Sequence, residues 1–200
     1  MRILVFGDSI VYGAWDEEGG WVQRLRKFID MRMLSQNFDP YYTVYNLGVS
    51  GDKTSDLIKR LDEEIPVRIE EKDEVMIIFG IGINDSGRKV DLVTFKGNLS
   101  KIIKTSKKFA SKIVFIGLTP VDESKTVPTG WDDSLSYDNQ TVQKYDEVIK
   151  SVCKLNDVQF VEIFNVMIKK DYKKLLEDGL HPNSDGHKEI FNIVKAKLFN

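Results

Sequence analysis

Cysteine and histidine are scarce in this 200-residue sequence. The single cysteine, Cys153, excludes an internal disulfide framework. It lies within an apolar helical pattern, which predicts a small buried side chain rather than a nucleophile. The two histidines do not combine with cysteine at metal-ligand spacing, so we expect neither a bound metal nor a cofactor.

Long apolar runs and a strong charge of one sign are also missing. The formal net charge is -2, which provides no electrostatic attraction for nucleic acid. No apolar stretch approaches the length of a membrane span, and the N-terminal run is too short for a secretory signal. We therefore expect one domain over residues 1–200, without integral membrane association. We expect a cytoplasmic location unless a signal has been removed, and the oligomeric state stays open, with a homodimer among the options.

Short apolar stretches alternate with longer amphipathic stretches. Runs rich in Val, Ile and Phe predict buried parallel strands at residues 3–6, 42–47, 74–81, 112–118 and 158–163. Apolar residues at helical spacing predict helices over residues 20–34, 54–65, 92–109, 142–155 and 184–198, and a short one within 166–176. This alternation predicts a three-layer α/β/α sandwich around a doubly wound, five-stranded parallel sheet of flavodoxin-like type.

Four polar segments follow predicted strands. Gly7-Asp8-Ser9, residues 46–51 and residues 82–85 come directly after the first three strands, and residues 178–182 come after the fifth strand and a short excursion. The carboxyl ends of parallel strands meet at one edge of the sheet, where binding sites form. The sequence therefore predicts that all four segments converge on one site.

The residue types in these segments suit nucleophilic catalysis. The hydroxyl of Ser9 needs a base to remove its proton, and the imidazole of His181 titrates near neutral pH. Pro182 favours an extended backbone at His181, whereas His187 falls within a predicted helix and is expected to be a surface or packing residue. Asp178, three residues before His181, is positioned to hold the imidazole in the required tautomer.

Acyl transfer also requires hydrogen-bond donors directed at the oxyanion that develops on the substrate. The backbone N–H of Ser9, the backbone N–H of Gly51 and the side-chain amide of Asn84 are the candidates. Gly51 has no side chain to obstruct a ligand. We expect Asp8 and Asp85 to be structural, since both lie in turns and can accept hydrogen bonds from loop backbone.

These motifs resemble those of GDSL-type esterases/lipases in the SGNH hydrolase superfamily. The matching blocks are Gly7-Asp8-Ser9-Ile10 with Gly13, Asn46-x-Gly48-x-x-Gly51 with Thr54, Gly82-Ile83-Asn84-Asp85, and Asp178-Gly179-Leu180-His181-Pro182. The resemblance implies the SGNH hydrolase fold and an ester hydrolase with Ser9 as nucleophile, His181 as base and Asp178 as its partner. It also implies an oxyanion hole formed by Ser9, Gly51 and Asn84.

Several functions stay open from sequence alone. An acyltransferase would use the same site, and a non-catalytic flavodoxin-like binding module would use the same fold; Asp8, however, lies where such a module would bind phosphate. The substrate class is also open among simple esters, lysophospholipids, thioesters and acetylated sugars. Trp15 and Trp131 lie in polar loops, and we interpret both as substrate-binding residues. Trp131 belongs to a long segment after the fourth strand and would form an apolar wall of the pocket.

Overall fold

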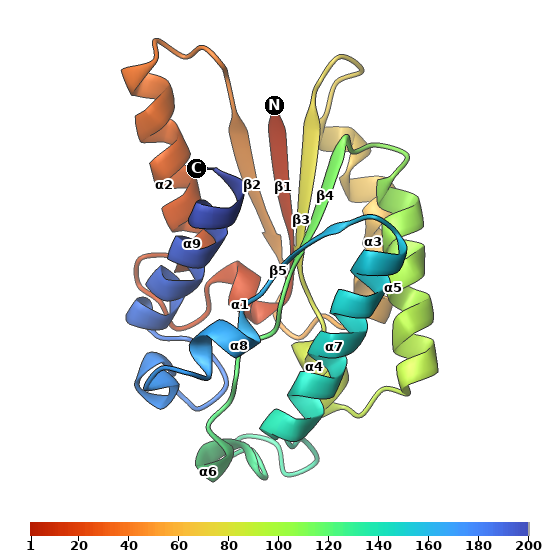
Figure 1. The fold of residues 1–200 in the computed structure, drawn as a ribbon, viewed down its shortest axis with the longest axis vertical. Helices are drawn as coiled ribbons and strands as arrows, with labels where there is room; N and C mark the ends of the chain where they lie inside the picture. The colour runs from red at the N-terminus through yellow and green to blue at the C-terminus, as the bar shows by residue number, and fades with distance from the viewer. Residues whose placement is uncertain (200) are drawn as a thin grey trace.

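The computed structural model describes residues 1–199 and has a parallel sheet between two helical layers (Figure 1). The strands are β1 (Arg2–Gly7), β2 (Thr43–Gly48), β3 (Val75–Gly80), β4 (Lys112–Ile116) and β5 (Gln159–Val161). Their order is β2-β1-β3-β4-β5, and every neighbouring pair is parallel. The chain first adds β2 on one side of β1 and then crosses over to add β3 on the other side. The predicted doubly wound, five-stranded sheet is therefore confirmed.

Two groups of long helices cover the sheet. One face carries α2 (Gly20–Ser35) and α9 (Ser184–Leu198), and the other carries α3 (Thr54–Glu64), α5 (Leu92–Ser106) and α7 (Asn139–Leu155) (Figure 1). In the part of the chain that the structure describes, no helix is long and apolar enough to cross a membrane.

Short helices occupy the connections, mostly near the carboxyl ends of the strands. They are α1 (Ser9–Tyr12), α4 (Ile83–Gly87), α6 (Glu123–Thr126) and α8 (Phe164–Met167), with 3₁₀ turns at Pro66–Arg68 and Tyr172–Leu175. The single short helix that the sequence predicts within residues 166–176 is therefore wrong in detail. The segment begins with the end of α8 and then forms a separate 3₁₀ turn.

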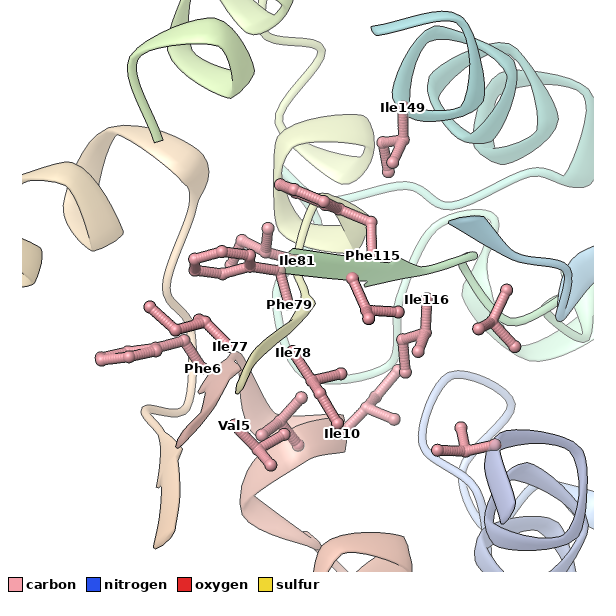
Figure 2. Close-up of a cluster of buried hydrophobic side chains, with 14 of the residues drawn as sticks. Val5, Phe6, Ile10, Ile77, Ile78, Phe79, Ile81, Phe115, Ile116 and Ile149 are labelled. Carbon is pink, nitrogen blue, oxygen red and sulfur yellow. The ribbon is translucent and has the colours of Figure 1, made fainter. Parts of the chain in front are cut away.

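Aromatic residues in register hold one face of the sheet together. Phe6 of β1 is paired with Phe79 of β3, which in turn is paired with Phe115 of β4. Their ring centroids are 5.9 Å apart for the first pair and 4.9 Å apart for the second, and Figure 2 shows the three rings on the same side of the strands. Ile78, the neighbour of Phe79, points to the opposite face, as strand geometry requires (Figure 2). The central strands are thus buried on both faces, which explains their uninterrupted apolar sequences.

Close backbone contact brings the first two strand ends together. A Cβ atom on Gly48 would lie 2.3 Å from the backbone N of Tyr12, so only glycine fits where β2 passes α1. The side chain of Asn46 donates to the carbonyl oxygens of Val11 at 3.0 Å and Tyr12 at 3.3 Å. Asn46 and Gly48 therefore fix the end of α1 against β2 and, with it, the loop that follows.

Candidate active site

Ser9 is the first residue of α1 and is separated from the end of β1 by Asp8 alone. The carboxylate of Asp8 caps this helix by accepting a hydrogen bond from the backbone N–H of Ile10 at 3.0 Å. Burial raises the pKa of Asp8 to about 7, because this carboxyl is removed from water. Asp8 is thus a buried structural residue, and Ser9 is held in a fixed backbone conformation beside it.

His181 and Asp178 lie in a tight turn before α9. One carboxylate oxygen of Asp178 accepts hydrogen bonds from the backbone N–H groups of Leu180 at 2.9 Å and His181 at 2.8 Å. Gly179, between them, has a φ of +94°, and a Cβ there would lie 2.7 Å from the Cβ of Lys125. The turn therefore requires glycine at this position, and it places the acid and the imidazole on the same side of the loop.

The structure brings the three polar side chains into one hydrogen-bonded series. The Oγ of Ser9 lies 3.0 Å from Nε2 of His181, and Nδ1 of His181 lies 2.7 Å from Oδ2 of Asp178. If the serine hydroxyl donates to Nε2, then Nδ1 carries the ring proton and donates to the carboxylate. Burial raises the pKa of Asp178, but the hydrogen bonds from His181 and Leu180 outweigh burial and leave the pKa well below its usual value. The carboxylate is therefore ionised at neutral pH.

Trp15 makes a further contact with this carboxylate. Its indole N–H lies 2.9 Å from Oδ2 of Asp178 and 3.0 Å from Nδ1 of His181, and its ring meets the imidazole edge-on at 5.8 Å. Because Nδ1 is itself a donor in the tautomer described above, the indole donates to the carboxylate. Trp15 has a φ of 64°, an uncommon value for a bulky residue, and the residue is 65% exposed.

The loop that carries Trp15 is anchored on both sides. Asp16 accepts a hydrogen bond from the backbone N–H of Gly20 at 3.0 Å and forms an ion pair with Arg24. The guanidinium of Arg24 also donates to the hydroxyl of Ser184, at the start of α9, at 2.8 Å. These contacts tie the loop to α2 and α9, and thereby hold the indole over the imidazole and the carboxylate.

The three candidate oxyanion donors belong to residues that line one open pocket of about 770 Å³. The N–H of Ser9 belongs to the first turn of α1, where N–H groups have no acceptor within the helix. Gly51 has a φ of +85°, and the space where a Cβ would stand is empty to 4 Å. The side-chain amide of Asn84 reaches the same pocket from the start of α4. The donors come from the ends of three strands, as the sequence predicts.

Aromatic side chains form much of the remaining pocket wall. Trp131 lines the pocket and belongs to the long segment after β4. Its ring centroid lies 6.3 Å from that of His181. Sequence reasoning did not identify Arg88, Leu135 or Tyr137, which also line the pocket. The one available signal was the long polar segment of residues 121–134, which contains Trp131 and ends just before Leu135 and Tyr137.

Other candidates lie away from this pocket. His187 is fully buried; its Nδ1 accepts from the backbone N–H of Trp21 at 3.3 Å, and its Nε2 lies 3.4 Å from the carbonyl oxygen of Ala14. It is a packing residue and not a surface residue. Cys153 is 1% exposed, and burial raises its thiol pKa to about 12. Residues 1–199 contain no group of three or more His, Cys, Asp or Glu side chains arranged to hold a metal ion.

Asp85 ties two of the site loops together. Its carboxylate accepts hydrogen bonds from the backbone N–H of Thr54 at 2.9 Å and from the hydroxyl of Thr54 at 2.6 Å. Asn98 donates to the same hydroxyl at 3.1 Å. Asp85 thus joins the start of α3 to α4, so that Gly51 and Asn84 are held in a fixed relation to each other.

A serine whose proton has a base at hydrogen-bonding distance, beside donors for an oxyanion, has the chemistry of a serine hydrolase. Comparison with known protein families leads to the same class. The chain belongs to the GDSL-like lipase/acylhydrolase family, whose family model matches residues 5–189. The protein is accordingly a carboxylic ester hydrolase, and the resemblance seen in the four sequence blocks is confirmed.

Two curated relatives have names that match this family, and a solved structure shares the fold. The chain is 26% identical to the GDSL esterase/lipase WDL1 of Oryza sativa subsp. japonica over 96% of this chain and 76% of the relative. It is 24% identical to an arylesterase of Vibrio mimicus over 98% of this chain and 88% of the relative. The crystal structure of a lipolytic protein of the G-D-S-L family from Veillonella parvula superposes with a TM-score of 0.77 at 18% identity, covering 99% of this chain and 98% of that one. The last comparison supports the fold alone.

Proposed function

We propose that this protein hydrolyses carboxylic esters through an acyl-enzyme formed on Ser9. The observation that carries the proposal is the series of hydrogen bonds from Ser9 through His181 to Asp178 at the wall of the pocket, with distances of 3.0 and 2.7 Å. A carboxylate that stays ionised holds the Nδ1–H tautomer and stabilises the imidazolium that forms when Nε2 takes a proton. The lone pair of Nε2 is then available to the hydroxyl of Ser9.

In the first half-reaction, the Oγ of Ser9 attacks the ester carbonyl carbon while its proton passes to Nε2 of His181. The carbonyl oxygen becomes an oxyanion and accepts hydrogen bonds from the N–H groups of Ser9 and Gly51 and from the amide of Asn84. The imidazolium then returns its proton to the leaving alcohol oxygen, the carbon–oxygen bond breaks, and the acyl group stays on Ser9. In the second half-reaction, His181 removes a proton from water while the water oxygen attacks the acyl carbon. The bond between that carbon and the Oγ of Ser9 then breaks, the imidazolium returns its proton to Oγ, and the acid leaves.

The pocket wall indicates where the substrate lies. Trp131 and Trp15 both line the pocket, with ring centroids 6.3 and 5.8 Å from that of His181, so groups attached to the ester would pack against aromatic side chains. The pocket is open, and its wall combines these rings with Leu180 and the cation Arg88. This composition favours an ester of a moderately polar alcohol over a long alkyl chain, which would need an enclosed apolar tunnel.

The test is chemical labelling together with turnover. A fluorophosphonate should label the native protein and leave Ser9→Ala unlabelled, and this variant should lose hydrolysis of p-nitrophenyl esters almost completely. Removal of the nucleophile in subtilisin costs about a million-fold in kcat. Ser50, a second serine of the pocket wall, provides the matched comparison: Ser50→Ala should still be labelled. Labelling of Ser9→Ala at the native rate would contradict the proposal.

The products of p-nitrophenyl ester turnover also distinguish hydrolysis from acyl transfer. With a primary alcohol added, an enzyme that favours water releases acid at an unchanged rate, whereas a transferase forms a new ester in proportion to the alcohol. We expect the acid to be the main product. A dominant ester product would assign the same acyl-enzyme to transfer.

A further inference from the structure

Two neighbours fix the side-chain amide of Asn84. Its nitrogen donates to the carbonyl oxygen of Asp52 at 3.0 Å, and its oxygen accepts a hydrogen bond from the hydroxyl of Tyr137 at 3.3 Å. Asn84 is 8% exposed and Tyr137 is 3% exposed, so water has little access to either group. Each end of the amide therefore has a defined protein partner.

The orientation of this amide decides whether it can bind an oxyanion. The nitrogen carries two hydrogens, of which one is donated to the carbonyl oxygen of Asp52. The proposed oxyanion hole requires the other to serve the pocket that Asn84 lines. If the amide turned by half a rotation, its oxygen would face the carbonyl of Asp52, and two acceptors would oppose each other. The pocket would then lose its N–H donor. A hydroxyl that donates to the amide oxygen of Asn84 therefore keeps the amide nitrogen in the orientation in which it can donate to an oxyanion.

Tyr137 is suited to this task because its hydroxyl is a fixed donor. Burial raises the pKa of Tyr137 to about 12, so the hydroxyl stays protonated at neutral pH. Two hydrogen bonds to Thr126 hold the backbone of Tyr137. The N–H of Tyr137 donates to the carbonyl oxygen of Thr126 at 2.9 Å, and the hydroxyl of Thr126 donates to the carbonyl oxygen of Tyr137 at 2.7 Å.

The ring of Tyr137 is also held from the side of α4. A Cβ atom on Gly87 would lie 2.2 Å from a ring carbon of Tyr137, so the ring packs directly on the backbone of the helix that carries Asn84. Gly87 has an ordinary backbone conformation and needs no positive φ. The absence of a side chain at this position serves the close approach of the ring.

We propose that Tyr137 is a positioning residue for the oxyanion hole, whose hydroxyl sets the orientation of the Asn84 amide. This inference rests on the proposed role of Asn84 in binding the oxyanion. It assigns a second purpose to the long segment after β4, beyond the pocket wall that Trp131 forms. Near its end, this segment places the hydroxyl of Tyr137 against the side chain of Asn84, which follows β3.

The test is a double-mutant cycle between Tyr137→Phe and Asn84→Ala. Tyr137→Phe keeps the ring and should lower kcat about 3- to 10-fold, the usual effect of losing one hydrogen bond, with KM unchanged within about twofold. In the Asn84→Ala background the same change should have no further effect on kcat, because the amide that it orients is gone. Thr126→Val, which loosens the backbone of Tyr137, should behave likewise, to a smaller extent, if Tyr137→Phe is poorly folded.

Tyr145 provides the matched control. It is a buried tyrosine whose hydroxyl donates to the carbonyl oxygen of Val90, and it is not part of the pocket wall. Tyr145→Phe should leave kcat unchanged even if it lowers stability. An equal loss of kcat from Tyr137→Phe in both backgrounds, or a change in KM alone, would overturn the inference. If Asn84→Ala itself leaves kcat unchanged, the proposed oxyanion hole fails instead.

Discussion

The buried histidine provides a prediction with a calculable size. His187 is 0% exposed, and burial lowers its pKa to about 4. In an unfolded chain the same imidazole has a pKa of about 6.5. The native protein therefore holds His187 neutral at pH values where the unfolded chain takes up a proton, and acid stabilises the unfolded state through this residue.

The magnitude follows from the difference between the two pKa values. A pKa lower by about 2.5 corresponds to a limit of about 3.4 kcal/mol, which is reached only below the native pKa. The stabilisation is complete above the unfolded pKa and is lost as the pH falls from about 6.5 towards 4. Between pH 7 and pH 5 the contribution of His187 to the free energy of unfolding decreases by about 2 kcal/mol.

Two buried carboxyls act in the opposite direction over the same range. Burial raises the pKa of Asp8 to about 7 and that of Asp146 to about 7, so protonation of each on acidification favours the native state. The stability of the native sequence alone therefore does not isolate the histidine. A comparison between variants does, because both carboxyls are present in each and their contributions cancel.

The assay is urea unfolding at pH 7 and pH 5 in a His181→Gln background, where His187 is the only histidine. Replacing it in addition with Gln should lower the free energy of unfolding at pH 7, because two buried hydrogen-bond partners are disturbed. This deficit should shrink by about 2 kcal/mol at pH 5. A deficit of equal size at both pH values would refute the reasoning. An NMR titration of His187 in the same background measures its native pKa directly.

Two further predictions concern the pocket. Asp178→Asn should lower kcat about 10⁴-fold, the loss that the equivalent change causes in the serine-protease triad, because the carboxylate accepts only N–H donors here and an amide favours the wrong imidazole tautomer. A loss in kcat of less than tenfold on p-nitrophenyl acetate, in a folded variant, would contradict this role. Trp131→Ala should change the relative kcat/KM values across a series of esters while Ser9 still reacts with a fluorophosphonate, and Trp131→Phe should keep most of the native preference. An unchanged preference in the alanine variant would remove Trp131 from the substrate site.

The sequence was sufficient for the sheet and the long helices. All five strands and the five long helices occur where apolar periodicity predicts them, and α9 has the predicted bounds. The short helices α1 and α4 were not predicted, because they are too short to show a repeat of 3.6 residues. They matter nonetheless, since Ser9 and Asn84 lie in their first turns.

Site residues whose role requires one particular amino acid could also be predicted from the sequence. Glycine and aspartate in the turn before α9, and asparagine after β3, are recognisable by their spacing in separate blocks. The contacts of Trp15 and Tyr137 were not, because each depends on a side chain crossing to a segment far away in the sequence. Tyr137 meets a residue 53 positions earlier, and Trp15 meets one 163 positions later. No local pattern specifies such a pairing, and only the packed loops create it.

The distance along the chain between Ser9 and His181, 172 residues, has a consequence for how activity arises during folding. Ser9, the proposed nucleophile, enters with the first strand, and His181, the proposed base, enters only when the last connection has reached the sheet. A nascent or truncated chain that ends before Asp178 would contain every strand but neither the acid nor the imidazole. On the proposed mechanism, unfinished chains would carry an unreactive serine, and ester cleavage would begin only once the segments that carry Ser9 and His181 have come together.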